Sequence, residues 1–309
     1  MSGTDDLSLG RFWAPRYWPT WLLLLGMHAA ARLPYAWLPP IGRRLGRAFA
    51  AFKRRERRTA ARNLELCFPE LAPAERAELL DRHFEAVGMS FLEMAMGWFW
   101  PIDRLLGIVR IEGREHLEHA LARQRGVILF AAHFTTVEVG AAVLEGLVQR
   151  CSCMYRPQRN AMMDAMIRRG RSRFAREQIP RDNVRMLLRQ LRDNFAVVYL
   201  PDQTYLGRQS ELLPFFGEPA LTNVATSKLA QISGATVLPY FFRRLPDNRG
   251  YVVNIGPPLA DFPTDDAAAD TRRLVALLEA YVRTAPEQYL WLYKKFKGRP
   301  APYGDPYRT

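Results

Sequence analysis

The clearest hydrophobic pattern in the chain is an unbroken apolar run over residues 127–132 that stops at His133. Such a run, rich in β-branched and aromatic residues, predicts a strand buried on both faces. Residues 135–149 follow with apolar positions at helical spacing, and Thr135 and Thr136 are suited to cap a helix. We therefore expect His133 at the carboxyl end of a buried strand, where α/β proteins commonly build their sites.

Strand-like and helical patterns alternate over residues 109–309, which predicts an α/β fold with a sheet flanked by helices. A second buried strand, residues 195–200, leads to Asp202. Because both strands end in polar residues, His133 and Asp202 could open onto one crevice. Further strands are expected at residues 151–155, 236–242 and 251–255, and helices at residues 160–174, 222–233 and 267–283.

The N-terminal part of the chain has a different pattern. Residues 1–16 are polar and are expected to be loosely ordered, and residues 17–38 form a mostly apolar stretch with Trp18 and Trp37 near its ends. Twenty helical residues span about 30 Å, the thickness of the bilayer core. We expect an N-terminal membrane-anchoring helix at 17–38, although Pro34 should bend or end it. A helix lying in the plane of the leaflet is the alternative.

Residues 39–108 are predicted to form a basic, helical region close to the membrane, since they are rich in arginine. The chain carries a net charge of +13, which favours an anionic partner. Positive charge beside a membrane segment stays on the cytoplasmic side, and each basic residue attracts anionic lipid by about 1 kcal/mol. A solvated helix face and a nucleic-acid patch are alternatives, but the adjoining apolar stretch favours the membrane. The basic run consists of Arg43, Arg44, Arg47, Lys53, Arg54, Arg55, Arg57 and Arg58.

The composition of the chain and the motifs that it lacks limit the classes of protein to which it can belong. The 309 residues, 49% of them hydrophobic, allow one large domain or two small ones. Cys67, Cys151 and Cys153 are expected to be free thiols in a reducing compartment, and no metal site is indicated. The patterns of P-loop proteins, dinucleotide-binding folds, α/β-hydrolases and zinc proteases do not occur.

The spacing of His133 and Glu138 provides candidate chemistry. Five residues on one helix turn by about 500°, so the two side chains could meet only if His133 stands outside the helix and Glu138 lies in its first turn. A carboxylate beside an imidazole fixes one ring tautomer and suits a general base acting on a hydroxyl. The alternative is a strand-end histidine bonded to backbone, with a solvated glutamate.

Beyond these two residues, a series of short motifs resembles the lipid A late acyltransferases, the lauroyl and myristoyl transferases of Gram-negative bacteria. The series runs nearly from end to end and is specific in order and number rather than in any one piece. It comprises Arg16-Tyr17-Trp18, Thr20-Trp21, Leu33-Pro34-Tyr35, residues 62–70 and 84–89, Trp98-Phe99-Trp100-Pro101, His133-Phe134 with Glu138, Tyr155-Arg156-Pro157, Gly170-Arg171, Pro201-Asp202, residues 285–292, Phe296-Lys297 and Arg299-Pro300.

The resemblance implies a glycerolipid-acyltransferase-like mixed sheet and an enzyme of the inner membrane, single-pass or monotopic, with its catalytic domain on the cytoplasmic side. The enzyme would move a fatty acyl chain, lauroyl by closest resemblance, from acyl carrier protein to a hydroxyl on an acyl chain of the Kdo-bearing lipid A precursor. Its partners would be the carrier protein, this precursor and anionic lipids, with no nucleic acid. It would act as a monomer without a cofactor beyond the acyl-carrier co-substrate.

The resemblance also implies roles for individual residues. His133 and Glu138 match the catalytic dyad of the family, while Arg171 and Asp202 match its functionally important arginine and aspartate. Arg156 is a third candidate for substrate binding. An ion pair between Arg171 and Asp202 that shapes the site without touching substrate is the alternative to direct binding.

One motif departs from the family. Many members have Pro-Asp-His-Asp-Tyr after the second strand, whereas this chain has Pro201-Asp202 followed by Gln203, Thr204 and Tyr205. The departure affects the assignment of the acyl-chain length and of the acceptor, so the myristoyl branch and another glycolipid acceptor remain alternatives. A non-catalytic basic protein that binds membranes or nucleic acid is a more remote one.

Overall fold

A seven-stranded sheet forms the centre of the molecule, with strand order β1-β9-β8-β2-β5-β3-β4. The structure is a computed structural model that describes residues 8–175 and 177–308. All neighbours in this sheet pair in parallel except β8 and β9, so the expected mixed α/β sheet is confirmed. Its strands are β1 (Val109–Glu112), β2 (Val127–Phe130), β3 (Cys151–Tyr155), β4 (Glu177–Pro180), β5 (Ala196–Tyr199), β8 (Thr236–Arg244) and β9 (Tyr251–Ile255), and a separate antiparallel pair is formed by β6 (Ser210–Phe215) and β7 (Glu218–Asn223).

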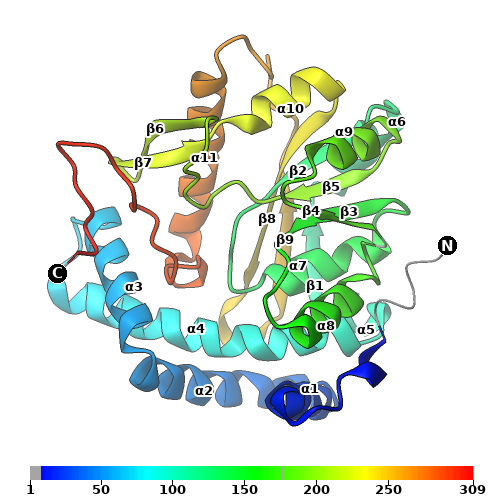
Figure 1. Ribbon diagram of the computed structural model, residues 1–309, viewed down its shortest axis with the longest axis vertical. Coiled ribbons are helices and arrows are strands. Elements are labelled where there is room, and N and C mark those ends of the chain that lie inside the picture. The colour runs from blue at the N-terminus through cyan, green and yellow to red at the C-terminus, as the bar shows by residue number, and fades with distance from the viewer. Residues whose placement is uncertain (1–7, 176, 309) are drawn as a thin grey trace.

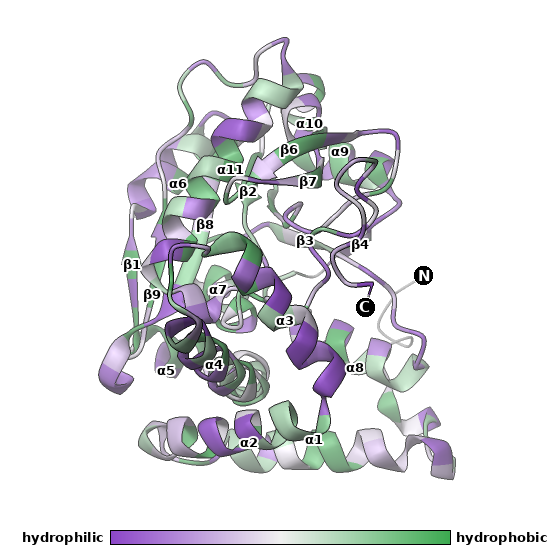
Figure 2. Cartoon of the chain, turned by 90° about the vertical axis from the view of Figure 1, so that its left-hand side faces the viewer, coloured by the Kyte–Doolittle hydropathy of each residue, from purple (hydrophilic) through white to green (hydrophobic). Residues whose placement is uncertain are grey.

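Helices cover the sheet in layers (Figure 1). The long helix α4 packs against α7, and α1 and α2 lie beyond α4 as an outer layer (Figure 2). Helices α6, α9 and α11 contact β2, β5 and β8, and α10 packs on α9 and α11. The helices are α1 (Trp18–Ala30), α2 (Leu38–Phe52), α3 (Arg54–Cys67), α4 (Pro73–Phe99), α5 (Ile102–Leu106), α6 (Arg114–Ala122), α7 (Val137–Val143), α8 (Ala161–Arg171), α9 (Val184–Arg192), α10 (Ala225–Ser233) and α11 (Ala267–Thr284).

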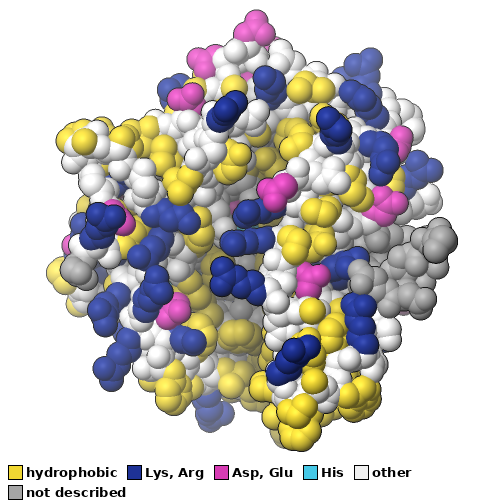
Figure 3. All heavy atoms as spheres, viewed as in Figure 1, with side chains coloured by type: hydrophobic (Ala, Val, Ile, Leu, Met, Phe, Trp, Pro, Cys, Tyr) yellow, Lys and Arg dark blue, Asp and Glu magenta, His cyan; other side chains and the backbone are white. Residues whose placement is uncertain are grey.

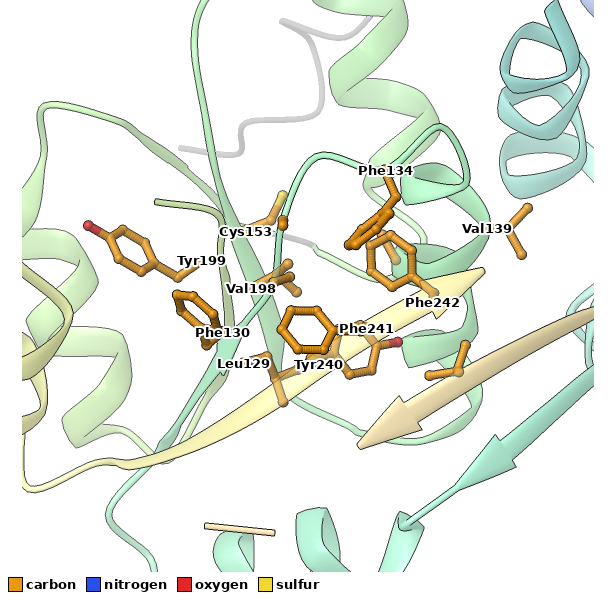
Figure 4. Close-up of a cluster of buried hydrophobic side chains, with 14 of the residues drawn as sticks. Leu129, Phe130, Phe134, Val139, Cys153, Val198, Tyr199, Tyr240, Phe241 and Phe242 are labelled. Atoms are coloured by element: carbon orange, nitrogen blue, oxygen red, sulfur yellow. The ribbon is translucent and has the colours of Figure 1, made fainter. Parts of the chain in front are cut away.

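The core lies on β2, which is buried along its whole length, as the apolar run predicts. Figure 4 shows aromatic side chains gathered over this strand and β8. Phe134 is one residue beyond His133 and contacts the rings of Phe241 and Phe242 edge-on, with centroids 6.2 and 5.8 Å apart. The apolar residue after His133 thus anchors the start of the loop in the core.

Other predicted elements agree with the structure except at specific points. Strands are confirmed at β3, β5, β8 and β9, and the helix over 222–233 begins only at Ala225, because Thr222 and Asn223 pair with β6. The β6–β7 pair and β4 were not predicted. Pro214 and Pro219 interrupt the strand pattern in the β6–β7 pair, where they face one another in the register.

The prediction of one continuous anchor helix over residues 17–38 is wrong. The helix α1 ends at Ala30, and Pro34 precedes a short 3₁₀ turn, Tyr35–Trp37, that leads into α2. Across the described residues, none of the helices combines the length and the apolar character that a membrane crossing requires. Residues 1–7 lie outside the described part, while Leu9 and Phe12 are buried against α8, so the expected loose order does not hold for them.

Helix α4 is held close to α2 by three glycines. A Cβ atom built on Gly88 would lie 2.1 Å from the carbonyl oxygen of Gly42 and 2.2 Å from the nitrogen of Gly46. Only glycine permits this backbone approach. The contact matters for the site because α4 carries His83 and Trp98.

Candidate active site

His133 lies in the loop between β2 and α7, and its side chain contacts a carboxylate from the neighbouring strand. Its Nδ1–H donates to Oδ1 of Asp202 at 2.7 Å, and its backbone N–H donates to Oδ2 at 3.1 Å. Asp202 follows β5, which pairs with β2 in parallel, so both residues lie at the carboxyl ends of adjacent strands. The expected common crevice for these two residues is therefore confirmed.

Asp202 is ionised in this setting. Burial raises the pKa of its carboxyl, but the attraction of His133 and the hydrogen bonds from its ring and backbone lower it more, so the pKa lies below its ordinary value. An ionised carboxylate can only accept a hydrogen bond, which assigns the proton to Nδ1 in the neutral ring and leaves Nε2 as an acceptor. The His133 side chain is 32% exposed whereas that of Asp202 is 1% exposed, so the ring can reach a substrate.

A small cavity adjoins the histidine. It has a volume of about 10 Å³, room for roughly one water molecule. On the face seen in Figure 3, Lys and Arg side chains border a hollow between the C-terminal loops and the region of α8, β3 and β4. The residues that line the small cavity are Asn63, His133, Asp202, Gln203, Tyr289, Leu290, Trp291, Tyr293 and Lys295.

Glu138 lies in the first turn of α7, with His133 outside that helix, as the spacing requires. Its carboxylate nevertheless binds other groups. The guanidinium of Arg171, at the end of α8, donates from Nε to Oε1 at 3.1 Å and also from Nη2. The indole Nε1–H of Trp98 donates to Oε2 at 2.9 Å. One carboxylate thus joins α4, α7 and α8.

The Glu138–Arg171 pair is charged on both sides. Burial raises the pKa of Glu138, but Arg171 and the hydrogen bond from Trp98 lower it more. Burial lowers the pKa of Arg171, yet the neighbouring Glu138 raises it above its ordinary value. The preceding Gly170 lets α8 approach α4, because a Cβ there would lie 2.3 Å from the Trp98 ring. The Gly-Arg motif therefore has a local packing reason.

The partners of His133 and Arg171 differ from those expected from the sequence. A direct contact between His133 and Glu138 was expected, but Asp202 occupies that position, because β5 lies beside β2 and brings its carboxylate to the ring. The alternative pair of Arg171 with Asp202 is also wrong, since Arg171 binds Glu138. The catalytic roles of His133 and Glu138 and the substrate-binding roles of Arg171 and Asp202 stay predictions.

Arg156 has a simpler position. It follows β3 and is exposed, and its carbonyl accepts a hydrogen bond from the Gln158 side chain at 3.0 Å. Since β3 is parallel to β5, Arg156 lies at the same edge of the sheet as Asp202. Its role in substrate binding stays a prediction.

Tyr289 and Lys295 were missed as site residues. The Tyr289 hydroxyl donates to Oδ2 of Asp202 at 3.0 Å, and the Lys295 ammonium donates to the Asp202 carbonyl at 2.6 Å. The motif over residues 285–292 includes Tyr289 but not Lys295, and it gives no local signal of a partner so far away in sequence. Only the folded sheet brings it to His133.

Potential metal ligands and the cysteines are the remaining groups that bear on chemistry in the described part of the chain. Across residues 8–175 and 177–308, no group of three or more His, Cys, Asp or Glu side chains could hold a metal ion. Cys67, Cys151 and Cys153 are free and buried, and burial raises the pKa of each thiol. These thiols are therefore protonated at neutral pH and poor nucleophiles.

Comparison with known proteins identifies the family and several relatives of the whole chain. The family model for bacterial lipid A biosynthesis acyltransferases matches residues 9–298. The chain is 37% identical to the lipid A biosynthesis lauroyltransferase of Escherichia coli K12, over 93% of this chain and 94% of that protein. It is also 37% identical to the palmitoleoyltransferase of the same organism, over 94% of each chain. The myristoyltransferase of that organism is 29% identical over 95% of this chain and 91% of its own.

Proposed function

Starting from the fact that the chain belongs to the bacterial lipid A biosynthesis acyltransferase family, we propose that it transfers a fatty acyl chain from acyl carrier protein to a hydroxyl group of the lipid A precursor. The acceptor would be a hydroxyl on an acyl chain of the Kdo-bearing precursor. The observation that carries the proposal is the partly exposed His133 ring, held by a buried carboxylate with its Nε2 left to accept a proton.

His133 would act as the general base. Its Nε2 accepts the proton of the acceptor alcohol while the alcohol oxygen attacks the thioester carbonyl carbon. The tetrahedral intermediate then expels the carrier thiolate, which takes the proton back from the imidazolium, so an ester and a free thiol result. Asp202 stabilises the imidazolium between these steps. Positioned proton transfer of this kind contributes about 10²–10⁴-fold in rate.

Glu138 and Arg171 would then shape the site. Their ion pair fixes the first turn of α7, which follows the His133 loop, against α4 and α8. The Arg171 side chain is still 24% exposed and can contact an acceptor phosphate or the thioester oxygen. Arg156, exposed at the same edge of the sheet, is the second candidate for binding acceptor phosphate.

Lauroyl is the acyl chain we propose, with myristoyl or palmitoleoyl transfer and another glycolipid acceptor as alternatives. Equal identity to a lauroyl and a palmitoleoyl relative supports the reaction more than the chain length. The test is to offer lauroyl, myristoyl and palmitoleoyl carrier protein with the tetra-acylated precursor and weigh the product. A mass gain of one lauroyl group from the first donor is expected. No gain from any donor, with the lauroyltransferase of Escherichia coli active alongside, would refute the transfer reaction.

We also propose that the α1–α2 layer lies in the cytoplasmic leaflet of the inner membrane. It leaves several large apolar side chains exposed beside exposed arginines of α2, a combination suited to an anionic lipid surface. In flotation with phosphatidylglycerol vesicles, the chain should bind, and the Leu22→Ser/Leu25→Ser variant should bind at least tenfold less. Leu277→Ser on α11 is the matched control, and equal losses in both variants would contradict the proposal. The exposed apolar residues of the layer are Trp18, Leu22, Leu23, Leu25, Trp37, Leu45 and Phe52.

A further inference from the structure

The segment that follows α11 pairs directly with the His133 loop. Phe134 and Tyr289 form an isolated antiparallel bridge. The N–H of Leu290 donates to the carbonyl of His133 at 2.9 Å, and the N–H of Thr135 donates to the carbonyl of Gln288 at 2.8 Å. We call residues 286–296 the C-terminal strap. The strap holds the backbone on both sides of Phe134.

Two residues of the strap donate hydrogen bonds to Asp202. The Tyr289 hydroxyl donates to Oδ2, the same oxygen that accepts the backbone N–H of His133, while Oδ1 remains for the imidazole. The Lys295 ammonium donates to the backbone carbonyl of Asp202. The carboxylate therefore has a donor on each oxygen and its main chain is tied as well, which restricts rotation of the group that orients the ring.

The strap is itself anchored on the helices below it. The Asn63 amide, on α3, donates to the carbonyls of Trp291 and Tyr293 at 2.7 and 2.8 Å. Nδ1 of the buried His83, on α4, lies 2.9 Å from the carbonyl of Glu287. The Tyr289 ring packs edge-on against Trp291 with centroids 4.8 Å apart. Such anchoring makes the strap a rigid support rather than a loose tail.

We propose that Tyr289 and Lys295 are positioning residues for acyl transfer, acting through Asp202 to fix the orientation and tautomer of His133. This inference rests on the proposed function, because it assigns a purpose to the orientation of a general base. Neither residue needs to touch substrate. They hold the carboxylate where its Oδ1 meets Nδ1 of the ring, so that Nε2 faces the acceptor in every turnover.

The protonation states fit these roles. Burial raises the pKa of Tyr289 well above its ordinary value, and the nearby Asp202 adds to the rise, so the hydroxyl keeps its proton and donates it. Burial lowers the pKa of Lys295 to about 8, although Asp202, Cys67 and Glu279 favour its charged form. Its ammonium also lies 4.7 Å from the centroid of the Phe215 ring.

The decisive variant is Tyr289→Phe in the full-length chain, because it removes one hydroxyl and keeps the packed ring. We expect kcat to fall about tenfold with KM unchanged. The acid limb of kcat/KM should move to higher pH, because an Asp202 freed from one donor is more negative toward the ring. Lys295→Met, which keeps the stem of the side chain, should lower kcat in the same way.

Tyr240→Phe is the matched control, since it removes an equally buried hydroxyl that donates to the carbonyl of Gly140 at 2.6 Å. It should lower the Tm to a similar extent and leave kcat and the pH profile unchanged. If Tyr289→Phe behaves like this control, the positioning role is refuted while acyl transfer by the wild type stands.

A readout independent of activity separates the two proposals. The imidazole Nδ1–H resonance of His133, assigned by its loss in His133→Ala, should shift in Tyr289→Phe and stay in place in Tyr240→Phe. If the wild type transfers no acyl chain but the resonance shifts, the proposed function fails and the positioning network stands. An unchanged resonance overturns the network itself.

Discussion

Two buried carboxylates lie close to the same loop and are used in opposite ways. Asp202 meets an imidazole that is 32% exposed, so its charge acts on a group that reaches outward. Glu138 is enclosed by Arg171 and Trp98, so its charge is neutralised within the protein. The first centre leaves a basic nitrogen available, and the second holds three helices together.

The difference teaches that burial and a lowered pKa do not by themselves mark a reactive group. Both carboxyls have a pKa below the ordinary value in spite of burial. What distinguishes them is the partner: a guanidinium stays protonated through any physiological pH change, whereas an imidazole can take up and release a proton. In the reaction that we propose, the proton is transferred at the His133 centre, whereas the ion pair of Glu138 with Arg171 stabilises the packing of α4, α7 and α8.

The largest effect is expected from His133→Ala. Acyl transfer should fall by about 10²–10⁴-fold, because the alcohol loses its base, while the free energy of unfolding should fall by about 1–3 kcal/mol, because Oδ1 of the buried Asp202 loses its donor. Carrier-dependent transfer and thermal unfolding measure the two quantities. His119→Ala, an exposed histidine of α6, is the control. Near-normal turnover of the His133→Ala variant would show that His133 is not the general base and that the two carboxylates do not differ in the way described.

The Glu138 centre should respond in stability instead. Arg171→Met leaves a buried carboxylate without its ion-pair partner and should lower the free energy of unfolding by about 3–5 kcal/mol. The double variant Glu138→Gln/Arg171→Met should recover much of this loss, because no charge is then left unpaired. Arg62→Met, which breaks an exposed pair with Glu65, should cost at most about 1 kcal/mol. Denaturant unfolding provides the values, and equal effects in both single variants would contradict the ion-pair role.

Acid should loosen the C-terminal strap, which pairs with the His133 loop, before it loosens the Glu138 centre. Burial lowers the pKa of His83 from 6.5 to about 4, against the hydrogen bond to Glu287. Between these values the unfolded state binds more protons, so the free energy of unfolding falls as the pH drops from 6.5 to 4, by about 3 kcal/mol. Glu138, whose pKa is lowered, contributes a further loss only below about 4.5. Hydrogen exchange of the C-terminal strap should therefore rise first, and a simultaneous rise at α7 and α8 would contradict this order.

The smallest but most discriminating effect comes from comparing Asp202→Asn with Glu138→Gln. Asparagine can donate to Nδ1 and favours the wrong tautomer. We expect kcat to fall by about 10²-fold, at the lower end of the loss expected when the base itself is removed. Glu138→Gln keeps the shape of its side chain. Compared with Asp202→Asn, it should lower kcat less and the Tm more. Single-turnover transfer and calorimetry on the same preparations test the pair. The reverse order in kcat would restore Glu138 as the partner of His133.

Much of the fold was predictable because the central strands carry their signal locally. The runs that become β2 and β5 are apolar without interruption, and the polar residue after each marks the edge of the sheet at which the site forms. The order of the strands was not predictable, because no periodicity tells that β5 lies beside β2. For this reason His133 and Asp202 could be singled out separately, but their pairing could not.

The spacing of His133 and Glu138 was misleading for a related reason. Five residues put Glu138 in the first turn of α7, as expected, but the choice of its partner depends on α8 and α4, which approach through Gly170 and Gly97. In the N-terminal stretch, too, the composition of the sequence did not determine the structure. Its apolar composition was evident, yet Pro34 divides it into separate helices.

The pairing of residues 133–135 with residues 288–290 has a genetic consequence. A premature stop codon just after Thr284 would leave every strand of the central sheet encoded. The truncated product would nevertheless lack the partner backbone of the histidine loop and the two donors that the C-terminal strap supplies to Asp202, the Tyr289 hydroxyl and the Lys295 ammonium. A nonsense mutation at this position should therefore behave as a null allele, although the central sheet is retained.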